Sequence, residues 1–454
     1  MTRDLSFLIP ELTLASVIVL MLIAEMARAP RVALGLGVLG LVAAAGLTLP
    51  LIDADTTVFS GTYRIDLLSA WGKLILLPGA ALTLLLARAE LAGSDREGSA
   101  YSLICLVTLG ALMLTGGGDM MMLVLGVVLT GLGSFALVAY PRDDKATEAA
   151  MKFLVFGSVC GAVMIYGLTF WFGAVGSTLF SALSKADAPL AVAIGLIALI
   201  VGLGYKSALF PFQFWAPDAY DGAPVSIAAF LSVITKIAAI FAFAQVLRDL
   251  APESGWRLAI AAIAVATMTF GNLAALVQSN IVRLLAYSSV AQSGYFLLGV
   301  VSLGESALSL RALIVFAAAY VAMNIGAFAV LMALGRHLDD FLGVGRTAPI
   351  TGAAMVVFLL SLAGIPPLFG FAGKFLLFAA AIEAKFIWLA VIAILNSVLS
   401  LAVYLRIIAP MYERREAQPP GRQSRNIMIR FTWLVALGAT LGFGVGAQLL
   451  LACI

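Results

Sequence analysis

Stretches of about 20 consecutive, mostly apolar residues recur along the whole chain. A helix of this length rises about 1.5 Å per residue and spans the roughly 30 Å hydrocarbon core of a bilayer. Of the 454 residues, 63% are hydrophobic and only 11% are charged. Soluble domains average about 25% charged residues, so this chain has more apolar surface than an aqueous fold can bury. The sequence therefore predicts an all-α, polytopic membrane protein.

The apolar runs predict about fourteen transmembrane helices. The first run is too long for the apolar part of a signal peptide and has no small-residue cleavage site after it, so we expect it to remain as a helix. The helices are expected over residues 7–27, 32–52, 67–88, 99–116, 119–140, 148–174, 189–211, 224–248, 256–278, 284–303, 308–335, 350–381, 386–410 and 428–452.

Lysine and arginine are concentrated in every second loop. The loops after odd-numbered helices hold most of them, including Arg28, Arg96, Arg142 and Lys145. Since short cytoplasmic loops are rich in basic residues, these loops are expected to face the cytoplasm and both termini the opposite side. The net charge of +3 comes with no basic tract suited to nucleic acid.

Two of the expected helices are interrupted by proline and glycine. The seventh runs into Pro211 and Pro217, and the twelfth contains Gly364, Pro366 and Pro367. Broken helices at matching positions of two repeats are typical of transporters built from inverted repeats. Two ordinary proline kinks are the alternative interpretation. We expect two inverted five-helix repeats, with the chain divided into residues 1–98 (helices 1–3), 99–250 (first repeat), 251–412 (second repeat) and 413–454 (a cytoplasmic loop and the last helix).

Three lysines lie inside the apolar runs: Lys206, Lys236 and Lys374. A charged side chain at the centre of a membrane helix costs roughly 2.5–3.5 kcal/mol on insertion scales. A lysine near a helix end avoids this cost by reaching the interface, and Lys73, early in its helix, fits that interpretation. Lys236 is farthest from both ends of its helix. Because burial disfavours the charged form of a lysine, such a residue can exchange its proton near neutral pH, which suits a relay.

Softer polar groups lie between these lysines. The ninth and tenth helices contain Asn272, Tyr287, Ser288 and Gln292. Hydroxyl and amide groups can hold water in a continuous path, or can join helices by hydrogen bonds. Both interpretations stay open for any single residue. Further polar residues of the same region are Gln278, Ser289, Tyr295, Asn324 and Asn396.

Residue types that hold metals and redox cofactors are scarce. Cys105, Cys160 and Cys453 lie in or beside apolar runs without a CxxC pair, and the one histidine, His337, lies in a polar loop. This set does not supply a zinc, haem or iron–sulfur site or a disulfide framework. The sequence has no nucleotide-binding loop, so we expect no cofactor in this chain.

Four stretches resemble the subunit N family of the bacterial proton-pumping NADH:quinone oxidoreductase, respiratory complex I, which is related to subunit 2 of the mitochondrial enzyme. They are "EAAMKFLVFGSVCGAVMIYGLTFWFGAVGST", "GLGYKSALFPFQFWAPDAYDGAPVS", "NIVRLLAYSSVAQSGYFLLG" and "SLAGIPPLFGFAGKFLLFAAAIEAKFIWLAVIAILNSVLSLAVYLR". The block "APDAYDGAP" is shared with subunits of Mrp-type antiporters. The "LAYSS" sequence and the first and last stretches are more similar to subunit N.

The resemblance implies a proton-translocating membrane subunit of an oxidoreductase in the bacterial inner membrane. In this family the lysines at the positions of Lys206, Lys236 and Lys374 form the central proton axis. NADH, quinone, flavin and iron–sulfur clusters are then expected in partner subunits, and the other subunits of the membrane arm are the expected partners.

The chain departs from the family pattern at three positions. The family usually has a glutamate on the fifth helix, where this chain has Val128, and the nearest acid, Asp119, lies at the edge of that helix. A nearby carboxylate would favour the charged form of Lys206. Gln213 and Gln292 replace histidines, and an amide orients water but does not take up a proton. Two alternatives therefore remain: an Mrp-like cation/proton antiporter subunit, and a structural subunit that does not conduct.

Overall fold

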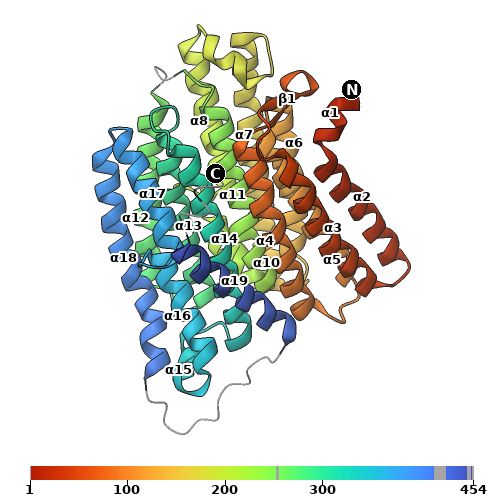
Figure 1. The fold of residues 1–454 in the computed structure, drawn as a ribbon, viewed down its shortest axis with the longest axis vertical. Helices are drawn as coiled ribbons and strands as arrows, with labels where there is room; N and C mark the ends of the chain where they lie inside the picture. The colour runs from red at the N-terminus through yellow and green to blue at the C-terminus, as the bar shows by residue number, and fades with distance from the viewer. Residues whose placement is uncertain (1, 252–254, 414–425, 447–450, 452–454) are drawn as a thin grey trace.

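The computed structural model describes residues 2–251, 255–413, 426–446 and 451, and nearly all of them lie in helices packed side by side (Figure 1). Among these residues, thirteen helices are long and apolar enough to cross a membrane. Two shorter helices of 15 residues each, α16 (Pro349–Ala363) and α17 (Phe369–Glu383), occupy the predicted twelfth span. With this pair counted as one crossing, the structure confirms the expected number.

The N-terminal helices lie at one edge of the bundle (Figure 1). They are followed by a short antiparallel hairpin in which Thr57 pairs with Arg64. The elements of this part are α1 (Thr2–Phe7), α2 (Ile9–Met26), α3 (Pro30–Thr48), β1 (Thr56–Val58), β2 (Tyr63–Ile65) and α4 (Leu67–Leu91), with short 3₁₀ turns at Leu49–Leu51 and Phe59–Gly61.

Two groups of five membrane crossings follow. The first comprises α5 (Glu97–Gly116), α6 (Met120–Val138), α7 (Asp144–Val175), α8 (Pro189–Lys206) and α10–α11 (Val225–Phe230, Lys236–Leu247), with a 3₁₀ turn at Phe180–Lys185 and the short helix α9 (Trp215–Gly222). The second comprises α12 (Trp256–Leu276), α13 (Ile281–Val301), α14 (Ser309–Leu334), the pair α16–α17, and α18 (Ile387–Tyr412), with a 3₁₀ turn at Leu338–Phe341 and the short helix α15 (Val344–Thr347). Because five is odd, the second group enters the membrane from the opposite side to the first.

The last described helix, α19 (Ile427–Val445), contacts α4, α14 and α17 and crosses in front of them in Figure 1. The most buried helices are α10–α11, α13 and α14, of whose membrane windows 94–100% is buried. In α2, α3 and α19 that fraction is 28–33%, so these helices keep most of their apolar surface on the outside. The polar residues of the predicted path therefore lie in the central helices.

The first helix break comes earlier than the pattern predicted: α8 ends at Lys206 and not at residue 211. Carbonyl groups released at membrane depth must find donors within the protein. The indole nitrogen of Trp215 donates to the carbonyl of Tyr205 at 2.8 Å, and the amide of Leu209 donates to that of Gly204 at 2.7 Å. The irregular segment thus satisfies the helix end that it follows.

The second break lies between α16 and α17, as predicted. Gly364 ends α16 with a φ of 89°, a left-handed conformation that glycine adopts without a steric penalty. The amide of Gly370 donates to the hydroxyl of Ser361 at 3.0 Å. Lys374, in the second turn of α17, donates to the released carbonyl of Ala363 at 3.2 Å. One of the predicted lysines therefore satisfies this helix end.

A π-helical turn, Leu231–Thr235, separates α10 from α11 directly before Lys236. Such turns leave a carbonyl without its usual partner and are frequent at functional sites. Here the hydroxyl of Tyr320 donates to the carbonyl of Ser232 at 3.1 Å, and the amide of Asn324 donates to the Ser232 hydroxyl at 2.6 Å. Helix α14 thus holds the distorted turn in place.

Candidate functional site

All three predicted lysines are buried. Their exposed fractions are 2% for Lys206, 1% for Lys236 and 1% for Lys374. They come from α8, α11 and α17, which are helices of both five-helix groups. None of the three side chains therefore extends to the surface of this chain.

Lys236 contacts the tenth crossing, α13. Its ammonium donates to the hydroxyl of Ser289 at 2.6 Å. It also lies 5.7 Å from the centre of the Tyr220 ring, whose face attracts a cation. Lys236 has no acidic partner in the described part of the chain, so the groups that stabilise its ammonium are a hydroxyl and an aromatic ring.

The next polar groups along α13 bond to α18. The hydroxyls of Ser288 and Tyr404 are 2.6 Å apart. The amide nitrogen of Gln292 donates to the Tyr404 hydroxyl at 3.2 Å and to the carbonyl of Leu362 at 3.1 Å. Leu362 lies on α16 beside Ala363, which binds Lys374. The polar groups therefore lead from the neighbourhood of Lys236 to that of Lys374.

Lys374 has the richest set of partners of the three lysines. Besides the Ala363 carbonyl, it donates to the hydroxyl of Ser397 at 3.1 Å. Its ammonium lies 4.1 Å from the centre of the Tyr295 ring, and Ser397 donates to the Tyr295 hydroxyl at 3.3 Å. The carbonyl end of α16 carries the negative end of the helix dipole, which favours a cation there.

Lys206 differs from the other two. Its ammonium has no hydrogen-bond partner among the described residues, and neither amide atom of the fully buried Gln213 has one. Buried polar groups of this kind are normally satisfied by water or by another chain. Val128, the altered family position, is 43% exposed and lines the same cavity as Lys206.

The structure places the remaining predicted residues beside the chain of polar contacts. The amide of Asn272 donates to the carbonyl of Asn396 at 3.1 Å and so joins α12 to α18. The half-buried ring of Tyr287 packs edge-on against Phe270, with the ring centres 6.3 Å apart. Within the described residues, no hydrogen bond joins Tyr287 to Ser288 or its partners.

Two members of this set, Tyr404 and Ser397, were missed by the sequence reasoning. A signal was present for Tyr404, because Asn396, Ser400 and Tyr404 are spaced four residues apart and therefore share one face of α18. This spacing in an otherwise apolar helix predicts a polar stripe. The stripe faces α12 and α13, as the bonds of Asn396 and Tyr404 show.

Lys73 was expected to reach the membrane surface, and this expectation is wrong. Its side chain is only 1% exposed, and its ammonium lies 2.6 Å from a carboxylate oxygen of Glu11 on α2. The hydroxyl of Tyr63 donates to the same oxygen at 2.6 Å. Burial together with the Glu11 charge holds the pKa of Tyr63 well above its usual range. A buried ion pair therefore joins the N-terminal helices to α4.

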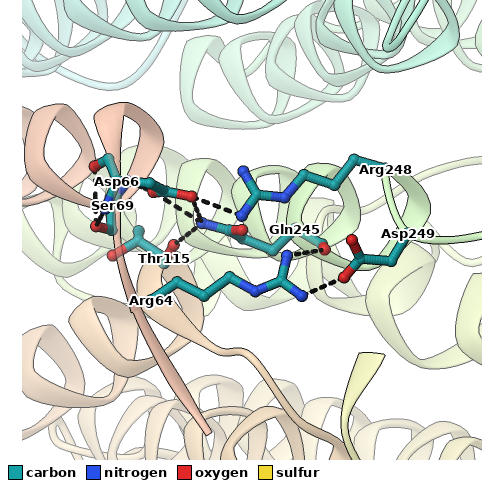
Figure 2. A network of polar contacts seen from close by, with 7 residues as sticks. All are labelled: Arg64, Asp66, Ser69, Thr115, Gln245, Arg248 and Asp249. Atoms are coloured by element: carbon teal, nitrogen blue, oxygen red, sulfur yellow. Dashed lines mark hydrogen bonds and ion pairs between the residues drawn. The ribbon is translucent and has the colours of Figure 1, made fainter. Parts of the chain in front are cut away.

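A second polar network joins α4 and α5 to the end of α11, the helix that carries Lys236 (Figure 2). Asp66 caps α4 by accepting the Ser69 amide at 2.8 Å, and Arg248 lies 2.7 Å from the same carboxylate. Gln245 donates to the Thr115 carbonyl at 2.7 Å. Arg64 bonds to Asp249 and to the Gln245 carbonyl, as Figure 2 shows. These contacts fix the position of α11 relative to the N-terminal helices.

The block "APDAYDGAP" lies largely on the short helix α9, and its two aspartates pair with basic residues near the starts of α7 and α13. Asp218 accepts from Arg283 at 2.8 Å and from Lys152 at 3.1 Å, and Asp221 lies 2.9 Å from Lys145. Burial raises the pKa of the Asp218 carboxyl, but the hydrogen bonds from Arg283 and Lys152 lower it by more, so its pKa lies below its usual range. Helix α9 is thus tied to α7 and α13.

Among the described residues, no three histidine, cysteine, aspartate or glutamate side chains are grouped so that they could hold a metal ion. Cys105 and Cys160 are buried and free. Cys453 lies outside the described residues.

Comparisons with known proteins agree with this architecture. Residues 117–400 match the model of the NADH:quinone oxidoreductase/Mrp antiporter transmembrane family. The chain is 35% identical to NADH-quinone oxidoreductase subunit N of Rhodospirillum rubrum, over 94% of this chain and 93% of that protein. It is 34% identical to F(420)H(2) dehydrogenase subunit N of Methanosarcina mazei, over 96% and 94%.

Among solved structures, a chain of respiratory complex I from Thermus thermophilus superposes with a TM-score of 0.87 at 31% identity, covering 98% of this chain and 99% of that one. The family match covers more than half of this chain, and both relatives are at least 34% identical over more than 90% of it. The chain therefore belongs to the NADH:quinone oxidoreductase/Mrp antiporter transmembrane family, among the relatives of NADH-quinone oxidoreductase subunit N.

Proposed function

We propose that this chain is an antiporter-like membrane subunit of a complex I-type oxidoreductase, and that it translocates protons while electrons are transferred in other subunits. NADH, quinone, flavin and iron–sulfur clusters belong to those partners in this proposal. The Methanosarcina relative is named for a different electron donor, which supports placing the donor-specific chemistry outside this kind of chain.

The observation that carries the proposal is the set of polar contacts between Lys236 and Lys374. Lysine, serine and tyrosine groups can each give up and accept a proton, and Gln292 orients its neighbours. Water molecules complete the steps between groups that do not touch. Lys206 receives a proton from the cytoplasmic side, Lys236 passes it across the centre, and Lys374 delivers it outward, with both termini on the outer side.

A structural subunit that does not conduct is the competing function. Val128 favours it, because Lys206 has no carboxylate partner in the described chain. Three buried lysines without ion pairs count against it, since each costs free energy to insert. An Mrp-like antiporter is the other alternative, but among the described residues the contacts between Lys236 and Lys374 include no carboxylate, the charged oxygen ligand that suits a hard cation.

The first prediction tests the contact chain at its narrowest point. Gln292→Leu removes the amide that bonds both Tyr404 and Leu362, while it keeps nearly the same volume. We expect the intact complex, reconstituted in vesicles, to lose most proton uptake per electron transferred.

Gln278→Leu is the matched control, because among the described residues the Gln278 side chain bonds only to the end of α12 just before it, at the Ala274 carbonyl, 3.1 Å away. The control is expected to pump normally. Equal proton uptake in the two variants, with both complexes assembled, would overturn the proposal that this contact chain carries protons.

A further inference from the structure

A cavity of about 240 Å³ lies between α6, α7 and α8, and Lys206 lines its inner end. Gly131 forms part of the wall, and a methyl group added there would lie 3.8 Å from the Lys206 ammonium. The outer rim is open, because Leu132 is 61% exposed and Val128 is 43% exposed. A buried ammonium without a partner is therefore next to a cavity that opens on the outer surface of the bundle.

The cavity lies near the centre of the membrane. Its lining residues Gly157 and Gly161 are at least 13 residues from either end of the 32-residue helix α7. At about 1.5 Å per residue, this is roughly 20 Å from each end. The hydrocarbon core is roughly 30 Å thick, so a lipid headgroup does not reach this depth. Acyl chains reach it but offer nothing to an ammonium.

The surrounding helices provide no counter-charge. Neither α6 nor α8 contains an acidic residue, and α7 has none after Glu148. Glu148 pairs with Lys152 at 2.7 Å, and Asp218 is engaged by Arg283 and Lys152. The carboxylate of Asp119 caps α6 by accepting the Met122 amide. The described residues of α6, α7, α8 and α9 therefore supply no anionic partner for Lys206.

We propose that a carboxylate side chain from a transmembrane helix of a neighbouring subunit enters this cavity and pairs with Lys206. At Gly161 an added methyl group would meet nothing within 4 Å, so the cavity wall is open there to the close approach of another helix. Ser158, which also lines the cavity, offers a hydroxyl as a second donor to the same carboxylate. The inference rests on the proposed function only in that it requires the chain to have membrane neighbours.

The experiment places a photoreactive group at the rim of the cavity. Leu132→p-benzoylphenylalanine is introduced in the full chain, the assembled complex is irradiated in its native membrane, and the cross-linked peptide is sequenced. Leu273→p-benzoylphenylalanine is the control, since Leu273 is 52% exposed on α12, which lies far from α6 in Figure 1. We expect Leu132 to capture an apolar segment of another subunit that contains an aspartate or glutamate, and we expect Leu273 not to capture it.

Capture of lipid alone, of a second copy of this chain, or of a segment without an acidic residue would overturn the proposal.

A second experiment replaces the captured acidic residue by its amide. Proton uptake should fall in that variant and should be regained when Val128→Glu supplies a carboxylate from this chain. Cross-linking does not depend on transport. If Leu132 captures the acidic segment but proton uptake does not depend on the lysines, the proposed function is refuted and the proposed interface stands.

Discussion

Each buried lysine of the described chain meets the cost of its charge in a different way. Lys73 pairs with a carboxylate, Lys236 with a hydroxyl and a ring, and Lys374 with a carbonyl, a hydroxyl and a ring. Lys206 has no partner among the described residues. A carboxylate holds an ammonium in its charged form, whereas hydroxyls and rings hold it weakly. Lys73 therefore differs from the other three lysines, which have no carboxylate partner among the described residues.

The ion pair of Lys73 predicts a large effect on stability. Glu11→Gln leaves a buried ammonium without its counter-charge, and removal of one partner from a buried pair typically costs about 3–5 kcal/mol. The double change Glu11→Leu with Lys73→Met should recover most of that loss. The melting temperature of the purified complex measures the effect of the single change and of the double change. Glu148→Gln, at an exposed ion pair, is the control and should cost no more than about 1 kcal/mol of stability. A loss of stability in Glu11→Gln that is no larger than in this control would show that the buried ion pair does not stabilise the fold.

The sequence predicted which lysines are buried in the centre of the bundle, but not all of the residues that they contact. Lys206, Lys236 and Lys374 stand out because a charge in an apolar run is conspicuous. Glu11 does not, because it lies near the start of its helix, where acids are common, and its partner lies two crossings away. Pairing between distant helices depends on packing, which a local pattern does not contain.

The two broken helices solve the same problem by different means. Released carbonyls of α8 are satisfied by Trp215 and by the backbone that follows, whereas the Ala363 carbonyl of α16 accepts a bond from Lys374. Lys374 therefore belongs to the helix break that it stabilises, while Lys206 is the last residue of its own helix. The proline and glycine pattern predicted both breaks. The π turn before Lys236 had no such signal, since Leu231–Thr235 contains neither residue type.

The ion pairs of α9 predict a pH dependence. Because the pKa of Asp218 is lowered in the folded protein, its contribution is present above the usual carboxyl pKa of about 3.9 and is lost as the pH falls below it. About a third of the side chain is exposed, so the contribution should not exceed roughly 1 kcal/mol. Hydrogen-exchange protection of α9 amides should be constant near neutral pH and should fall in acid.

Asp218→Asn should lower that protection at pH 7 and remove the further loss in acid. Asp187→Asn, at an exposed position before α8, serves as the control and should behave as the unaltered protein. Protection of α9 that is unchanged in Asp218→Asn would show that these ion pairs do not hold the helix.

For the whole molecule, the arrangement places polar groups in the centre and apolar groups at the edges. The helices that carry Lys236 and its contacts are almost wholly buried, and the outer helices expose apolar side chains. Hydropathy and the broken helices predicted the number of crossings, the two five-helix groups and the central position of the lysines. The path between the lysines did not, because it depends on which faces of α13, α16 and α18 meet.

The most direct test of proton transfer through this chain is Lys236→Ala in the intact complex, reconstituted in vesicles, with proton uptake and electron transfer measured together. The set of polar contacts that leads to Lys374 begins near Lys236, whose one hydrogen-bond partner among the described residues is Ser289. We expect the complex to assemble and proton uptake per electron to fall. Unchanged proton uptake in an assembled complex would contradict it and would assign this chain a structural role.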